Sequence, residues 1–375
     1  FSGVEGPAAP TVLGALIVGK KVAAWSVAVL GVLIPYLSLW PAPIDPSDWD
    51  PPTVPPLEGD YAENRILQSL ELFDTPGMRG PEDVAVAADG RIYVGVEEGK
   101  ILRYDADGSS VAVFAETGGR PLGLDFDLDG NLIVADAAKG LLSIDSSGAV
   151  TVLCTEADGV PLGFTDDVDV DSQNVAWFSD ASTKWDHHHV MNEALESRAN
   201  GRLVKYDTRT AECTTVLGDL YFANGVAVSP DDTYVLVNET TRYRTKRVFV
   251  RGPRAGVVEM FIENLPGFPD GISTGADGVY WLALYAPRNE LLDEAGPKPW
   301  LRRVIYRIPA ALQPKPRRHP FILGLDADAN VVRNLQDSEG RDFSKTTSAE
   351  QVGDILYVGS LTEPKWGRLD LSSLQ

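Results

Sequence analysis

The chain has 375 residues, and apolar residues make up 44% of it, a globular composition that excludes wholesale disorder. It carries 33 basic and 54 acidic residues, a net charge of −21. This excludes ordinary nucleic-acid binding, which requires clustered positive charge. Two cysteines, Cys154 and Cys213, are too few for a disulfide framework or a cysteine zinc site. They could form one disulfide in an oxidising compartment, and the sequence leaves this open.

The N-terminal part of the chain has the pattern of a membrane anchor. Residues 22–40 contain no charged residue, Lys20 and Lys21 precede them, and acidic residues follow. A helix of about 20 apolar residues crosses a bilayer, and basic flanks face the cytoplasm. We therefore expect 22–40 to be a transmembrane helix in contact with lipid, with 1–21 cytoplasmic and everything after it extracytoplasmic. A cleaved signal peptide is the alternative, although its apolar region is usually shorter.

A proline-rich segment follows the predicted anchor. Seven prolines fall between Pro41 and Pro56. Proline restricts the backbone and favours extended, semi-rigid spacers. We expect residues 41–59 to be a linker that lifts a soluble domain, residues 60–375, away from the membrane.

The predicted soluble domain is built from a repeat. In the first copy, a strand over 82–86 is followed by an Asp-Gly turn at 89–90 and by strands over 91–94 and 100–105. Asp-Gly between apolar runs is a strong hairpin signal. Further copies begin near residues 122, 167, 225, 271 and 355.

The spacing of these copies predicts the fold. Repeats of about 40–50 residues with four strands each are typical of propeller blades. The prediction is an all-β, six-bladed β-propeller over 60–375, preceded by one transmembrane helix. Residues 64–73 would add an outer strand to the sixth blade and close the ring, which leaves no exposed sheet edge.

Four blades place an oxygen-bearing side chain just before the innermost strand: Glu82, Asp166, Asn224 and Asp270. Any one of them could be only a turn former. Four in register around one axis predict convergence at the channel mouth, where carboxylates would repel unless a cation lies between them. Oxygen donors alone select a hard ion, and the mixed carboxylate and amide set favours Ca²⁺ over Mg²⁺. We predict one Ca²⁺ there, with Asp167 as an alternative to its neighbour.

Two long links between second and third strands should cover this mouth. They span 182–200 in the third blade and 286–303 in the fifth. Loops in such positions form pocket walls or lids and set specificity. The residues that we expect to contribute are Trp185, His187, His188, His189 and Trp300. A histidine could be a catalytic base, but a solvated cluster is the commoner reason for three adjacent histidines.

Four stretches carry a family resemblance, namely 178–185, 201–207, 222–226 and 263–270. In them the chain resembles the strictosidine-synthase-like and adipocyte plasma membrane-associated protein family. That family is related to the six-bladed calcium propellers of gluconolactonase and paraoxonase. The resemblance covers roughly residues 60–371. It implies that Glu82, Asp166, Asn224 and Asp270 occupy the family's calcium-ligand positions.

Departures from these relatives narrow the expected chemistry. Asp166 stands where relatives usually carry Asn, and Gly271 stands where the membrane-associated relative and the paraoxonases have Asn. Strictosidine synthase resembles the chain in outline, but Glu350 is out of register with that enzyme's catalytic glutamate. A Pictet–Spengler condensation is therefore not expected. The histidine pair of paraoxonases is also missing, because residues 134–138 contain no histidine.

The remaining chemistry is metal-assisted hydrolysis. Calcium would act as a Lewis acid on the carbonyl of an ester or lactone, with Asp166 or Asp167 as the general base. A cation would also lower the pKa of that carboxylate, which opposes the base role. We expect a membrane-anchored, calcium-dependent esterase or lactonase. The alternative is a non-catalytic, calcium-stabilised propeller that serves as a binding subunit of a membrane complex.

Overall fold

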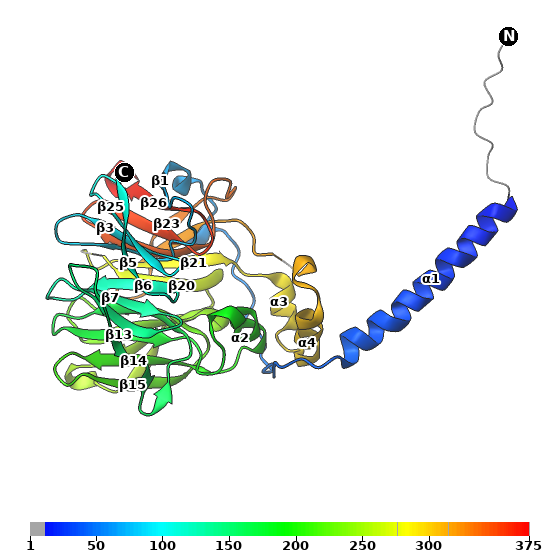
Figure 1. Ribbon diagram of the computed structural model, residues 1–375, viewed down its shortest axis with the longest axis horizontal. Coiled ribbons are helices and arrows are strands. Elements are labelled where there is room, and N and C mark those ends of the chain that lie inside the picture. Colours follow the sequence, from blue (N-terminus) through cyan, green and yellow to red (C-terminus); the bar gives the residue numbers. More distant parts are fainter. Residues whose placement is uncertain (1–11, 276, 314, 375) are drawn as a thin grey trace, which may run out of the picture.

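The structure is a computed structural model that describes residues 12–275, 277–313 and 315–374. Helix α1 (Val12–Leu39) projects away from the body of the molecule (Figure 1). Most of the predicted cytoplasmic segment, residues 1–11, lies outside the described residues. Among the described residues, no helix is long and apolar enough to cross a membrane. The predicted transmembrane anchor over 22–40 is therefore not confirmed.

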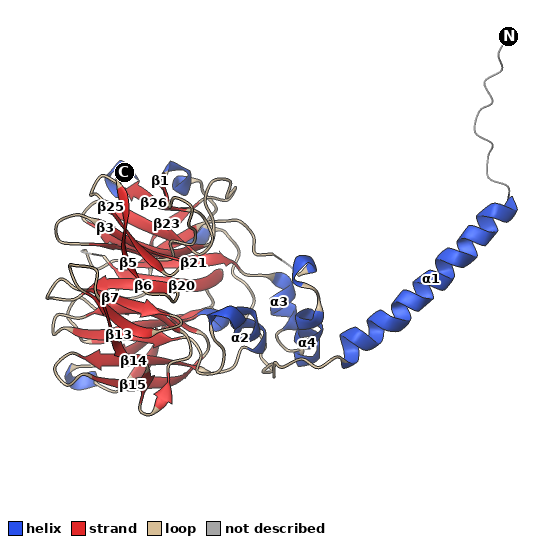
Figure 2. Cartoon of the chain, viewed as in Figure 1, coloured by secondary structure: helices blue, strands red, loops and turns tan. Residues whose placement is uncertain are grey.

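The described residues of the propeller form six four-stranded antiparallel sheets, whose strands are the red arrows of Figure 2. Blade 1 holds β2 (Val84–Val86), β3 (Ile92–Val96), β4 (Lys100–Tyr104) and β5 (Val111–Glu116). Blade 2 holds β6 (Pro121–Phe126), β7 (Leu132–Asp136), β8 (Gly140–Ile144) and β9 (Val150–Cys154). Blade 3 holds β12 (Thr165–Val170), β13 (Val175–Asp180), β14 (Gly201–Asp207) and β15 (Glu212–Leu220). A small hairpin, β10 (Glu156–Ala157) with β11 (Val160–Pro161), separates blades 2 and 3.

The second half of the ring repeats the pattern. Blade 4 holds β16 (Ala223–Val228), β17 (Tyr234–Glu239), β18 (Arg244–Phe249) and β19 (Val258–Ile262). Blade 5 holds β20 (Gly267–Thr274), β21 (Tyr280–Pro287), β22 (Phe321–Leu325) and β23 (Val331–Gln336). Blade 6 holds β24 (Thr346–Val352), β25 (Ile355–Ser360), β26 (Lys365–Asp370) and, from the start of the domain, β1 (Glu71–Asp74). The predicted six-bladed propeller is confirmed.

Strand β1 closes the ring as predicted, although it is shorter than the expected 64–73. It pairs with β26, with Glu71 opposite Arg368 and Asp74 opposite Lys365. Residues 66–69 form a 3₁₀ helix instead of a strand. Closure between the two ends of the domain leaves each blade with a full set of four strands.

Three short helices cover one end of the propeller, and we call them the cap. They are α2 (Val190–Glu196), α3 (Glu290–Ala295) and α4 (Pro299–Arg307), and they arise from the two long links between strands (Figure 1). Leu195, Ala295 and Ile305 form a shared buried cluster that holds them together. The apolar positions of the two links therefore pack as helices, where the sequence predicted only loops.

The proline-rich segment does not stand clear of the propeller. Ile44 is only 2% exposed because it packs into the apolar cluster of the cap. Asp45 forms exposed ion pairs with Arg198 and Arg303. Part of the segment predicted as a linker over 41–59 therefore packs on the cap, since burial of apolar side chains outweighs the preference of prolines for an extended, solvated chain.

Cys154 and Cys213 form a disulfide, which answers the question that the sequence left open. Cys154 ends β9 and Cys213 lies in β15, so the bond joins the outer strands of blades 2 and 3. Both half-cystines pack against the apolar cluster between these blades. Such bonds are typical of proteins that fold in oxidising compartments.

Candidate functional site at the channel mouth

A repeated irregularity of the innermost strands shapes the channel mouth. The innermost strand of five blades shifts register against its neighbour at the same point, within 121–124, 165–168, 223–226, 269–272 and 346–349. A β-bulge bends the strand and re-aims its side chains. In three blades the bulge contains a predicted ligand: Asp166, Asn224 or Asp270. The bulges therefore orient the side chains of Asp166, Asn224 and Asp270, which are more than turn formers.

The four predicted ligands are all buried at this mouth. The exposed fractions are 6% for Glu82, 5% for Asp166, 6% for Asn224 and 8% for Asp270. Burial raises the pKa of Glu82 well above its ordinary value, and repulsion by Asp270 and Asp166 raises it further. Burial and repulsion by Asp270 likewise raise the pKa of Asp166. These mutual effects show that carboxylates from three blades approach one another.

Asp270 and Asn224 interact directly. Burial raises the pKa of Asp270 to about 7, while a hydrogen bond from Asn224 lowers it. The Glu82 and Asp166 carboxylates are buried and are repelled by Asp270. Burying several carboxylates close together is costly, so this donor set fits a hard cation chemically.

The described conformation does not assemble a metal centre. Within residues 12–275, 277–313 and 315–374, no group of three or more His, Cys, Asp or Glu side chains is arranged to hold an ion. The four oxygen donors thus share one mouth of the channel without forming a coordination shell. Calcium at this place stays a prediction.

Arg120 adds a positive charge that sequence reasoning missed. It is 6% exposed and donates from Nη1 to the Gly80 carbonyl at 2.9 Å. Burial lowers the pKa of Arg120, and the charge of Glu82 raises it. The positive charge of Arg120 in turn lowers the pKa of Asp166, against the effect of burial. The repeat gave no signal for this arginine, because the position after Pro121 that corresponds to Glu82 and Asp270 holds Leu122, and Arg120 lies before the proline.

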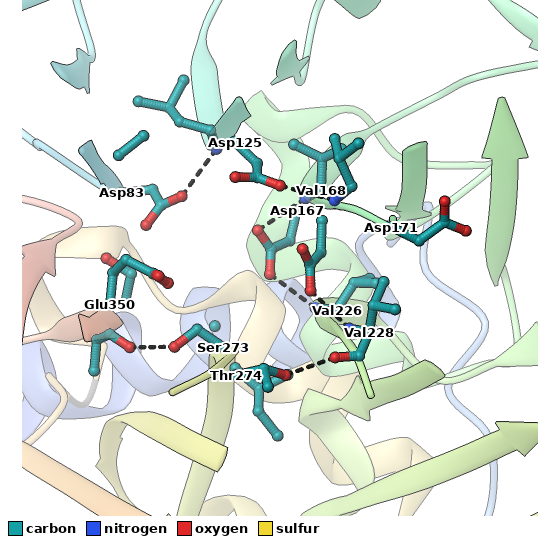
Figure 3. Close-up of a pocket in the computed structure, with 18 of the residues that line it drawn as sticks. Asp83, Asp125, Asp167, Val168, Asp171, Val226, Val228, Ser273, Thr274 and Glu350 are labelled. Atoms are coloured by element: carbon teal, nitrogen blue, oxygen red, sulfur yellow. Dashed lines mark hydrogen bonds between the residues drawn. The ribbon is translucent and has the colours of Figure 1, made fainter. Parts of the chain in front are cut away.

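Asp167, the second predicted catalytic residue, is held by backbone amides. Its Oδ2 accepts from Val226 N at 2.8 Å and its Oδ1 from Val168 N at 2.9 Å (Figure 3). Asp83 binds Leu124 N in the same way, at 2.9 Å. Each carboxylate therefore links the innermost strand of its blade to that of the next blade.

This arrangement continues into the far half of the channel, around a cavity of about 250 Å³ (Figure 3). Asp125 Oδ2 accepts from Val170 N at 2.8 Å, and Asp169 Oδ2 accepts from Val228 N at 2.6 Å. Burial raises the pKa of Asp169 to about 6. Sequence reasoning missed both residues, although the two-residue period of a strand places Asp169 on the same face as Asp167.

Replacing Asp167 with alanine should therefore lower stability. Two backbone amides would lose their acceptor inside the protein, and each such loss costs about 1–3 kcal/mol. We expect a free energy of unfolding lower by about 2–4 kcal/mol in urea denaturation. Asp129→Ala, a change of an exposed aspartate in a turn, is the matched control. Equal stability of the two variants would contradict the linking role.

Close packing at the axis leaves no room for a side chain at Gly271. A Cβ atom at position 271 would lie 2.5 Å from the carbonyl oxygen of Thr347 in the next blade. A Cβ at Gly225 would lie 2.4 Å from the carbonyl oxygen of Asp270. Neither contact is possible without backbone movement, so these two blades accept only glycine after the predicted ligand.

A second cavity, of about 230 Å³, lies between the cap and the predicted ligands. Asn224 and Asp270 line it together with mainly apolar side chains. The aromatic residues among them are Trp49, Phe222, Tyr243, Phe268 and Tyr285. Burial, and then Asp270, raise the pKa of Tyr285 to about 12, so this phenol remains protonated at neutral pH. The cavity can hold a molecule with a polar head and an apolar body.

The long links line this cavity, but through residues other than those predicted. The contributing residues are Val190, Met191, Ala194, Leu195, Asn289, Leu292, Arg302 and Ile305. Because these positions belong to helices, the side chains that face the cavity follow a helical period, which a loop prediction could not supply.

The five predicted loop residues do not line the cavity. Trp185 packs on the cap and donates from Nε1 to Glu196 at 2.7 Å. The His187 ring contacts Phe164, with centroids 6.4 Å apart, and burial lowers the pKa of His187. The remaining three, His188, His189 and Trp300, are exposed.

The blades and the buried ring of oxygens define the class of this protein: a six-bladed propeller with an acidic and amide-lined mouth beneath a helical cap. Residues 59–104 match the N-terminal part of the strictosidine synthase-like family, and residues 166–253 match strictosidine synthase. The adipocyte plasma membrane-associated protein of Danio rerio is 34% identical over 359 residues, covering 89% of this chain and 85% of the relative. The chain belongs to the strictosidine synthase-like family, which includes that relative.

Other relatives agree with this assignment. Strictosidine synthase-like protein 4 of Arabidopsis thaliana is 37% identical over 336 residues, covering 88% of each chain. Among solved structures, a gluconolactonase of Xanthomonas campestris matches with a TM-score of 0.58 at 17% identity, covering 88% of this chain and 99% of that one. The calcium-binding protein regucalcin of Agrobacterium tumefaciens matches with a TM-score of 0.57 at 17% identity, covering 80% and 93%. At this identity, the two structures establish the fold alone.

Proposed function

We propose that this protein is a calcium-dependent hydrolase of carboxylic esters or lactones. The observation that carries the proposal is the burial of the Glu82, Asp166 and Asp270 carboxylates close together, with Asp270 also lining the apolar cavity. The gluconolactonase and regucalcin folds support it, since these proteins are named for lactone chemistry and for calcium binding. Glu82, Asp166, Asn224 and Asp270 would hold the ion. When bound, Ca²⁺ would supply Lewis-acid polarisation of a carbonyl group.

The residues of this chain would perform the other parts of the reaction. Asn224 and Asp270 line the cavity and would orient the polar head of the substrate. Asp166 is the better candidate for a general base, because both oxygens of Asp167 already accept backbone hydrogen bonds. The apolar walls would exclude water from the rest of the substrate.

A direct assay tests this proposal. The purified full chain is incubated with phenyl acetate and with a series of lactones, first with Ca²⁺ and then with the chelator EGTA. We expect turnover that depends on calcium and returns when calcium is added back. The absence of hydrolysis across the whole series would overturn the enzymatic proposal.

The described conformation also favours a second candidate. Because the aspartates deeper in the channel link neighbouring blades, the buried charges of the channel would serve the scaffold. The protein would then be a non-catalytic binding subunit of a membrane complex. Calcium-dependent stabilisation without any hydrolysis would favour this candidate.

We also propose that the protein is associated with a membrane. Several relatives are adipocyte plasma membrane-associated proteins. Many apolar side chains from Trp25 to Trp40 are exposed, and contact with lipid would remove them from water. The disulfide supports placement of the propeller on the extracytoplasmic side. Sedimentation of the full chain with phosphatidylcholine vesicles, lost on removal of α1, is the expected result.

A further inference from the structure

The segment that joins α1 to the propeller lies across the cap, and we call residues 44–53 the strap. Ile44 packs with Leu195 and Ile305 in the apolar cluster of the cap. Ser47 N donates to the Glu196 carbonyl at 2.9 Å, at the end of α2. The first half of the strap is therefore fixed by both apolar and backbone contacts.

The second half of the strap is fixed to the cap and to two blades. Trp49 N donates to the Gly296 carbonyl at 3.3 Å. Arg288, which follows β21, donates from Nη2 to the Pro52 carbonyl at 2.7 Å. Asn264, which follows β19, donates from Nδ2 to the Thr53 carbonyl at 3.0 Å. A free linker would make none of these contacts.

Arg242 clamps the centre of the strap. Its guanidinium carbon lies 4.3 Å from the centre of the Trp49 ring and 3.8 Å from that of the Tyr221 ring. Its Nη2 donates to the Ser197 carbonyl at 3.0 Å. Arg242 is only 7% exposed, and a cation–π contact is stronger when it is desolvated.

This clamp presents Trp49 to the cavity. Trp49 lines the cavity that also contains Asn224 and Asp270, and its ring centroid lies 5.7 Å from that of Tyr243. The strap is thus a wall of the site as well as a connection to α1. The connection is close, since Arg307 of α4 donates to the carbonyls of Leu37 and Trp40 at the end of α1.

We propose that Trp49 determines ligand specificity at this cavity, by contacting the apolar body of a molecule whose polar head faces Asn224 and Asp270. Arg242 is the positioning residue that holds the Trp49 ring in place. The ligand class is a carbonyl compound with an apolar chain or ring. The binding role stands on the geometry of the strap, and only the carbonyl head rests on the proposed hydrolase function.

Binding of the neutral fluorescent probe Nile red to the full chain tests the wall directly. Loss of an aromatic contact should weaken binding of the probe about 5–10-fold in Trp49→Ala. Trp49→Phe, which keeps a ring, should restore most of the affinity. Trp300→Ala, the same change at an exposed cap position outside the cavity, should bind as the wild type does. Equal affinity in all four proteins would overturn the proposal.

Two further measurements separate this inference from folding and from the proposed reaction. Arg242→Lys keeps the charge and loses the stacking, so its affinity should fall between those of wild type and Trp49→Ala, with the melting temperature measured alongside to report the loss of stability separately. In hydrolysis, Trp49→Ala should raise KM for δ-decalactone and leave KM for δ-valerolactone unchanged. If neither lactone is hydrolysed, the hydrolase proposal fails while the Nile red result still decides the role of Trp49.

Discussion

Replacing Asp270 with alanine is expected to make the protein more stable than wild type without calcium and less stable than wild type with calcium. In wild type without calcium, three carboxylates are buried close together. Burial raises the pKa of all three, and repulsion by Asp270 raises the pKa of Glu82 and Asp166 further. Removing one of them should stabilise the calcium-free protein at pH 8, by roughly 1–4 kcal/mol. With calcium the order should change, because the variant has lost a ligand.

The dependence on pH follows from the same shift. The folded-state pKa of Asp270 is about 7, above its ordinary value of 3.8, so between these values the folded protein binds more protons than the unfolded chain. The contribution of Asp270 to stability without calcium should therefore be largest below about pH 4, and this contribution should be lost as pH rises to about 7. Stabilisation by calcium should be larger at pH 8 than at pH 5.

Differential scanning fluorimetry with Ca²⁺ and with EGTA checks both expectations. Glu350→Gln is the matched control, because burial also raises the pKa of Glu350 but this residue lies in the far half of the channel. It should keep the full calcium response. A calcium response of Asp270→Ala equal to that of wild type would show that the mouth is not the calcium site. In the hydrolysis assay, loss of activity in a folded Asp270→Ala variant would favour the enzyme over the scaffold.

Removing the disulfide is expected to cause the largest loss of stability. Cys154 and Cys213 are 59 residues apart, and a crosslink that closes a loop of this length contributes about 4 kcal/mol by restricting the unfolded chain. Replacing both residues with serine should lower the free energy of unfolding by about that amount in urea denaturation. The effect should be centred on blades 2 and 3, whose outer strands the bond joins.

The reducing agent dithiothreitol provides the control for this prediction. It should lower the melting temperature of wild type toward that of the double variant and leave the variant itself unchanged. A double variant as stable as the oxidised wild type would mean that the packing between blades 2 and 3 is sufficient without the bond.

Much of the candidate site was predictable because it is periodic. The positions of Glu82, Asp166, Asn224 and Asp270 relative to their strands follow from the repeat, and the structure buries all four at one mouth of the channel. Arg120 was not predictable in this way, because the second blade departs from the repeat at that point. The hydrogen bond from Val226 N to Asp167 was not predictable either, because it joins two blades and depends on how they pack.

The sequence alone determined the number of blades, the closure of the ring by the first strand and the oxygen chemistry of the mouth. These features depend on local turn residues and on alternation within short strands, which every blade repeats. Only the tertiary structure decided that the long links are helices, that the proline-rich segment lies on them as a strap, and that Trp49 reaches the cavity. The physical reason is that each of these depends on burial between segments up to about 260 residues apart, as between Asp45 and Arg303, and no local pattern encodes such contacts.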